Sequence, residues 1–175
     1  MAICAAAPLP QTGEHYFEVS FRLPSFRDPT REKDLDGAYQ RNAAVGLWCA
    51  PKLGIDNNTL AQLLTKHGKP FWGLRGDKDN DALRVRGKAF GKVGLNSSGW
   101  AISNGDTVGV LVNMDNPSMT FFRDGQPIPN AIIRLSYTDG FKKTDARIAV
   151  CCVTGSVTLT HKRREDGQDQ VSATL

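Results

Sequence analysis

Apolar and polar residues alternate along residues 15–23, HYFEVSFRL. Phe17, Val19 and Phe21 occupy every second position, and a repeat of two is that of a β-strand with one buried face. Short runs with strand character follow along the chain. We therefore expect further strands at residues 43–50, 69–76, 82–89, 106–114, 118–123, 131–136, 146–153 and 156–161.

Glycine, proline, asparagine and aspartate separate these runs. A series of short strands joined by such residues is typical of an antiparallel sandwich or barrel. One short helix is predicted within residues 51–70, because Asn58 or Thr59 can cap its start and Gly68 can end it. Its apolar positions are Leu60, Leu63 and Leu64. The pattern predicts an all-β fold with one short helix in a loop.

The segment NMDNPSMTFFRDGQPI, residues 113–128, holds acidic and amide side chains that suit either turns or a metal site. Asp124-Gly125 is typical of a type I′ turn, which needs positive φ at both central residues. Asp115-Asn116-Pro117 also suits a chain reversal. The six residues between these turns span roughly 20 Å as a strand, whereas calcium ligands lie about 2.3–2.6 Å from the ion. We interpret both acidic groups as turns.

The chain has 175 residues, enough for one domain with a hydrophobic core. We divide it into an N-terminal extension at 1–14, a sandwich domain at 15–161 and a polar tail at 162–175 that we expect to be partly disordered. The segment 24–42 has prolines, a glycine and many charges, and it reads as a long exposed connection.

Charge and cysteine usage set the expected compartment. The formal net charge is +4, and the charges of both signs are interleaved, which is mild evidence for an anionic partner. Four cysteines form no C-x-x-C pair, and the N-terminus lacks the basic start of a secretory signal. We expect a cytoplasmic or nuclear protein with reduced thiols and no membrane partner.

Known catalytic and metal-binding patterns fit poorly. Asp77, Asp79 and Asp81 begin like a calcium loop, but the sixth position is Ala82 and the twelfth is Lys88. Phosphate-binding and nucleophile-elbow motifs are absent from the sequence, and the histidines stand far apart. We expect no enzymatic activity, no catalytic residue, no metal, no cofactor and no small-molecule substrate.

The run GDTVGVLVNMDNPSMTFFRDGQPI resembles the central signature of the SPRY (B30.2-type) domain family. The upstream pieces HYFEVSF, AVGLW and PFWGLRGD, and the downstream piece ARIAVCCVTGSVTL, are similar to other strands of that family in the same order. The resemblance covers residues 15–160. It implies a bent antiparallel β-sandwich, a concanavalin-like jelly roll, without catalytic machinery. It also implies a noncatalytic adaptor or scaffold module that binds a protein or peptide through loops at one end.

The chain departs from the family in its loops. Some peptide-binding members carry Val-Trp-Gly in the turn between the last two strands, where this chain has Val153, Thr154 and Gly155. The segments 24–42 and 51–70 are longer than usual for the family. From the loops we select these candidate partner-binding residues: Arg27, Tyr39, Lys52, Leu53, Asp56, Asn57, Tyr137, Val153, Thr154 and Gly155.

The alternative hypothesis is an RNA-binding accessory domain. Arg84 and Arg86 would share one face of a strand, and a basic cluster follows the last strand. The basic face of this hypothesis consists of Arg84, Arg86, Lys88, Lys92, Lys162, Arg163 and Arg164.

Overall fold

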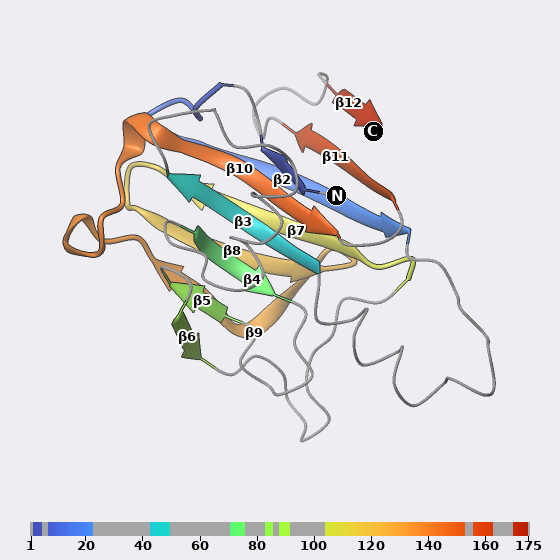
Figure 1. Cartoon of the computed structure of the whole chain (residues 1–175), viewed down its shortest axis with the longest axis horizontal. Coiled ribbons are helices and arrows are strands. Elements are labelled where there is room, and N and C mark those ends of the chain that lie inside the picture. Colours follow the sequence, from blue (N-terminus) through green and yellow to red (C-terminus); the bar gives the residue numbers. More distant parts are fainter. Residues whose placement is uncertain are drawn as a thin grey trace.

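Two six-stranded antiparallel sheets lie face to face (Figure 1). The structure is a computed structural model that describes residues 2–4, 7–22, 43–49, 71–75, 83–85, 88–91, 104–152, 156–162 and 170–174. Two short 3-10 helices, η2 (Tyr137–Asp139) and η3 (Lys143–Asp145), lie between β9 and β10. Within these ranges, no helix is long and apolar enough to cross a membrane.

Each sheet combines strands that are distant in the sequence. The first sheet has the order β1 (Ala2–Cys4), β10 (Ala146–Cys152), β3 (Ala43–Cys49), β4 (Phe71–Arg75), β5 (Leu83–Val85) and β6 (Lys88–Gly91). The second has the order β12 (Gln170–Thr174), β11 (Ser156–Lys162), β2 (Glu14–Arg22), β7 (Thr107–Asn113), β8 (Ser118–Arg123) and β9 (Gln126–Arg134). Strand β3 contacts β7, and β4 and β5 contact β9, so the β5–β6 edge of one sheet lies over the β9 edge of the other.

The core fills the space between the sheets. In β2 the predicted alternation holds, with Phe17, Val19 and Phe21 buried and the residues between them partly exposed. Strand β3 is buried along its whole length. The largest fully buried side chains are Trp72, Phe21, Phe71, Phe121, Phe141, Leu47, Leu74, Met114, Met119 and Ile133. The all-β antiparallel sandwich predicted from the sequence is confirmed.

The two turns of the 113–128 segment are also confirmed. Asp124 and Gly125 have φ values of 48° and 80°, as a type I′ turn requires. The strands on either side pair directly, with Arg123 opposite Gln126. At the other end of β8, the backbone N–H of Asn116 donates to the Asn113 side-chain oxygen at 2.7 Å. Local side-chain hydrogen bonds of this kind favour a chain reversal.

Two strand predictions were wrong in extent. The single strand expected at 82–89 is a pair, β5 and β6, with Val85 opposite Lys88. The strand expected at 131–136 is β9, which begins at Gln126 and includes Pro127 and Pro129. Proline is tolerated on an edge strand, where a missing N–H breaks no ladder bond. The predicted helix of residues 51–70 and the connection 24–42 lie outside the described residues.

The terminal segments contribute two strands that the sequence analysis did not predict. Strand β1 pairs with β10 and β12 pairs with β11, each at a sheet edge. Edge strands need only one neighbour to satisfy half of their backbone groups. Strand β1 has only three residues, too few to show a two-residue repeat, and β12 lies in a polar segment.

Candidate functional site

Tyr137 is the one candidate partner-binding side chain within the described residues, and it is 62% exposed. It begins the 3-10 helix η2, and Leu135 and Ser136 separate it from the end of β9. The Ser136 hydroxyl accepts a hydrogen bond from the Thr138 backbone N–H at 3.2 Å, and the Gly140 N–H donates to the Tyr137 carbonyl at 3.0 Å. These bonds fix the backbone that carries the exposed ring.

The residues behind Tyr137 connect it to the core. Phe141 is buried, and its ring centroid lies 6.0 Å from that of Tyr137 and 6.1 Å from that of Trp72. The Phe141 N–H donates to the Ser136 carbonyl at 3.2 Å, which closes the turn. The Tyr137 ring is therefore exposed on a backbone that the core holds in place.

The other candidates lie outside the described residues, but the strand ends define where their segments attach. Residues 23–42 leave β2 at Arg22 and enter β3 at Ala43, and residues 153–155 join Cys152 to Ser156. Ala43 pairs with Cys152, and Arg22 pairs with Ser156. Both segments therefore attach at one end of the sandwich.

The segment 50–70 and the η2 region attach at the opposite end. Cys49, at the end of β3, pairs with Ala146, at the start of β10. The seven residues of β3 separate the two ends by roughly 20 Å. The candidates thus fall into two groups by attachment point: one holds Lys52, Leu53, Asp56, Asn57 and Tyr137, and the other holds Arg27, Tyr39, Val153, Thr154 and Gly155.

The basic residues of the RNA hypothesis attach to two distant places. Arg84 and Lys88 belong to β5 and β6, at one edge of the first sheet, while Lys162 ends β11 in the second sheet. The β5–β6 edge lies over β9, which is at the far side of the second sheet from β11. Arg86, Lys92, Arg163 and Arg164 lie outside the described residues. The three described positions, Arg84, Lys88 and Lys162, do not lie on one continuous face.

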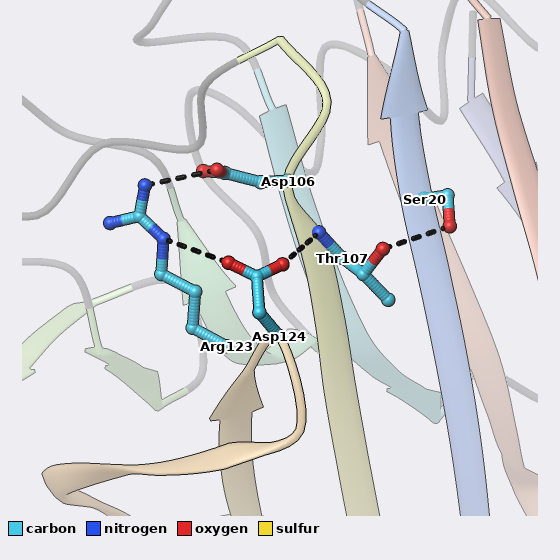
Figure 2. A network of polar contacts seen from close by, with 5 residues as sticks. All are labelled: Ser20, Asp106, Thr107, Arg123 and Asp124. Carbon is cyan, nitrogen blue, oxygen red and sulfur yellow. Dashed lines mark hydrogen bonds and ion pairs between the residues drawn. The ribbon is translucent and has the colours of Figure 1, made fainter.

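Asp106 and Asp124 belong to a network of polar contacts that links β2, β7 and β8 (Figure 2). Asp106 is 8% exposed, and one of its oxygens lies 2.9 Å from an Arg123 guanidinium nitrogen. The Asp124 carboxylate accepts a hydrogen bond from the Thr107 backbone N–H at 3.1 Å, and the Asp124 N–H donates to the Thr107 carbonyl at 2.8 Å. The Thr107 hydroxyl in turn lies 3.1 Å from that of Ser20 on β2.

Asp115 has a similar structural role at the opposite end of β8. One of its carboxylate oxygens accepts a hydrogen bond from the Gly13 backbone N–H at 3.0 Å. The Met114 N–H also donates to the Gly13 carbonyl at 2.9 Å. The Asp115 and Asp124 carboxylates therefore both bind backbone groups of neighbouring segments, as expected for turn residues.

Two histidines that are distant in the sequence lie side by side. The His161 ring stacks on the Phe17 ring with centroids 4.5 Å apart. The centroids of the His15 and His161 rings are 6.2 Å apart. His15 Nε2 is 2.9 Å from the Thr12 carbonyl oxygen. Within the described part of the chain, no three His, Cys, Asp or Glu side chains form a group that could hold a metal ion.

The sequence analysis missed the exposed side chain Ile132. It lies on β9 and is 55% exposed. Its neighbours Ala131 and Ile133 are fully buried, so the two-residue repeat places Ile132 on the outer face. The sequence signal for this exposed side chain was the isoleucine at an outward-facing position of the predicted strand AIIRLS.

Comparisons with known proteins support the fold at low sequence identity. No family model matches the chain, and no curated protein matches it. The PSpry domain of TRIM65 superposes with a TM-score of 0.51 at 17% identity, over 93% of this chain and 71% of that one.

The chain has a SPRY-type fold. The SPRY domain of human HERC1 superposes over 94% of this chain and 83% of its own length, with a TM-score of 0.48 and 12% identity. An alginate lyase of polysaccharide lyase family 7 gives a TM-score of 0.31 at 10% identity, over 87% of this chain and 62% of the lyase. The antiparallel β-sandwich implied by the SPRY resemblance agrees with this fold.

Proposed function

We propose that this SPRY-type chain is a noncatalytic protein-interaction module. It recognises a peptide segment or a partner surface through loops at one end of the sandwich, as a subunit or targeting domain of a larger assembly in the cytoplasm or nucleus. Function resides in the residues of a site rather than in the fold that carries them. The observation that carries the proposal is the exposed ring of Tyr137 on its fixed turn.

Tyrosine is enriched among the few residues that dominate binding energy at protein interfaces. A tyrosine ring offers a large contact area and a hydroxyl that can bond to a partner, at a low cost in side-chain entropy. The buried Phe141 supports one side of the Tyr137 turn, and the rest of the Tyr137 ring faces solvent. This combination fits a binding residue better than a residue that only stabilises the fold.

The attachment points of the loops support the choice of one end of the sandwich. Residues 50–70 leave the sheet where β10 begins, on the same side as the segment that carries Tyr137. Lys52, Leu53, Asp56 and Asn57 are therefore the candidate contacts that accompany Tyr137. Arg27, Tyr39, Val153, Thr154 and Gly155 form a second candidate group at the opposite end.

Affinity purification with quantitative mass spectrometry tests this assignment. The bait carrying Lys52→Ala, Asp56→Ala and Tyr137→Ser is compared with the wild-type chain. The changed bait is expected to lose a specific partner by roughly tenfold or more, the size of one interface hot spot. A matched bait carrying Arg27→Ala and Tyr39→Ser, at the other end, is expected to retain it.

Identical partner profiles for the wild-type chain and the triple variant would contradict the proposed site. Loss with the Arg27 and Tyr39 changes alone would move the site to the opposite end. Circular dichroism of each bait checks that the sandwich remains folded.

A further inference from the structure

Strand β9 forms an open edge of the second sheet. It pairs with β8 on one side, and within the described residues it has no strand partner on the other (Figure 1). An edge strand presents unpaired N–H and C=O groups, which can pair with an added strand.

The backbone of the second half of β9 has a defined orientation. The Leu135 N–H donates to the Pro117 carbonyl at 2.8 Å, and Ile133 lies opposite Met119 on β8. Backbone groups in an antiparallel pair point alternately toward and away from the neighbour. The N–H and C=O groups of Ile132 and Arg134 therefore point away from β8, toward the open edge.

The first half of β9 is unsuited to accept a strand. Pro127 and Pro129 have no N–H to donate, and Asn130 has a φ of 60°, which interrupts the extended backbone. Pairing is thereby limited to residues 131–134. Short edges with prolines resist unspecific strand pairing, so the remaining stretch is selective for a short occupant.

The side chains beside this stretch form a recognition surface. Ile132 is 55% exposed, and Arg134 is also exposed. An open groove of about 560 Å³ adjoins them on the outer face, and its lining residues are Asn116, Pro117, Ser118, Ile132, Arg134 and Leu135. The groove thus combines an apolar wall, a cation and polar groups.

We infer that this β9 edge binds an extended peptide segment as an added antiparallel strand. The segment carries an acidic residue that pairs with Arg134 and, two positions later, an apolar residue that packs on Ile132. Alternate residues of a strand share one face, so both side chains would lie on the outer face beside the groove. In the antiparallel direction the acidic residue comes first, which gives the pattern acid-x-apolar.

Charge decides between a peptide and a second copy of the chain. No salt bridge joins Arg134 to a described residue. Residues 130–134 contain no carboxylate, so a β9 edge from a second copy would bring a second Arg134 and no countercharge. An acidic segment supplies the missing charge.

A selection of displayed random heptapeptides on the purified chain tests the inference. Enrichment of acid-x-apolar peptides is expected, with affinity reduced about tenfold by Arg134→Glu and by Ile132→Lys. Repeating the selection on Arg134→Glu is expected to enrich a basic residue in place of the acidic one. Arg22→Glu, an equal charge reversal at the exposed end of β2, is the matched control and is expected to leave binding unchanged.

The backbone contact has a separate test. Ile132→Pro removes an N–H that points away from β8, so it is expected to abolish peptide binding and preserve the fold, while Ile132→Val is expected to retain binding. No enrichment, or binding that survives both Arg134→Glu and Ile132→Pro, would overturn the inference. A dimer in sedimentation velocity that Ile132→Lys dissociates would overturn it in favour of self-association.

This edge uses neither Tyr137 nor the 50–70 segment. Loss of a partner with the Tyr137 variant therefore reports on the proposed function, whereas loss of peptide binding with the Arg134 variant reports on the β9 edge. Each proposal can fail while the other holds.

Discussion

Tyr16 shares the outer face of β2 with Glu18, and its ring contacts that of Phe122. Its ring meets Phe122 edge to face, with centroids 5.7 Å apart. Partial burial, the nearby negative charge of Glu18 and a hydrogen bond to Glu18 together raise the pKa of Tyr16 from 10.0 to about 12. The folded chain therefore holds the phenol proton more tightly than the unfolded chain does.

This raised pKa predicts a loss of stability at alkaline pH. The contribution of Tyr16 is fully present below pH 10, the unfolded pKa, and is lost as pH rises through about 12, the folded pKa. In Tyr16→Phe the free energy of unfolding should fall less steeply over this window. Urea unfolding across the window measures the slope, with Thr160→Val on neighbouring β11 as a nonionising control.

A free energy of unfolding that fell equally steeply with pH in wild type and in Tyr16→Phe would contradict the assignment of the phenol as the titrating group. A flattened slope in the Thr160→Val control would do the same. Tyr16 and Thr160 lie on the same outer face of the second sheet, so both variants alter a similar surface.

At the scale of elements, the close approach of β3 and β4 depends on paired glycines. Gly46 lies opposite Gly73 in the register. A Cβ on Gly46 would clash with the Trp72 carbonyl oxygen and the Gly73 Cα. Both atoms belong to the backbone of a central strand, so they can move only if the sheet moves.

Gly46→Ala is therefore expected to destabilise the sandwich by about 1–3 kcal/mol or more, the cost of overpacking a core. The change is measured as a shift in the midpoint of urea unfolding, with an unchanged dependence of the free energy of unfolding on urea concentration. Gly125→Asn is the comparison, because a Cβ there meets nothing within 4 Å and asparagine tolerates the positive φ of that turn. Equal losses of unfolding free energy in Gly46→Ala and Gly125→Asn would contradict the close approach of β3 and β4.

The sequence predicts those elements whose patterning is local. The alternation in β2 and the Asp124-Gly125 turn each follow from a few neighbouring residues, and both are present. Strand β9 was only half predicted because Pro127 reads as a breaker, and only its place at an edge makes it acceptable. Edge position is a property of the whole sheet, which local patterns do not report.

At the scale of the whole molecule, the sheet register separates the strand ends to which the predicted binding segments attach. The sequence suggested one cluster of loops, and Ala43 and Cys49, where two of these segments attach, lie at opposite ends of β3. Tyr137 was selected from its place directly after the strand predicted at 131–136, and its side chain is exposed. The exposure of Ile132 depended on its register opposite Thr120.

The central claim is that partners bind at the end of the sandwich that carries Tyr137. A photo-crosslinking amino acid placed at position 137 tests it directly, with position 126 as the control. Gln126 is also exposed, but it lies at the far end of β8, opposite Arg123. Illumination in cells is expected to yield a discrete crosslinked partner from position 137 and none from position 126. Crosslinks from position 126 alone, or from neither position, would contradict the claim.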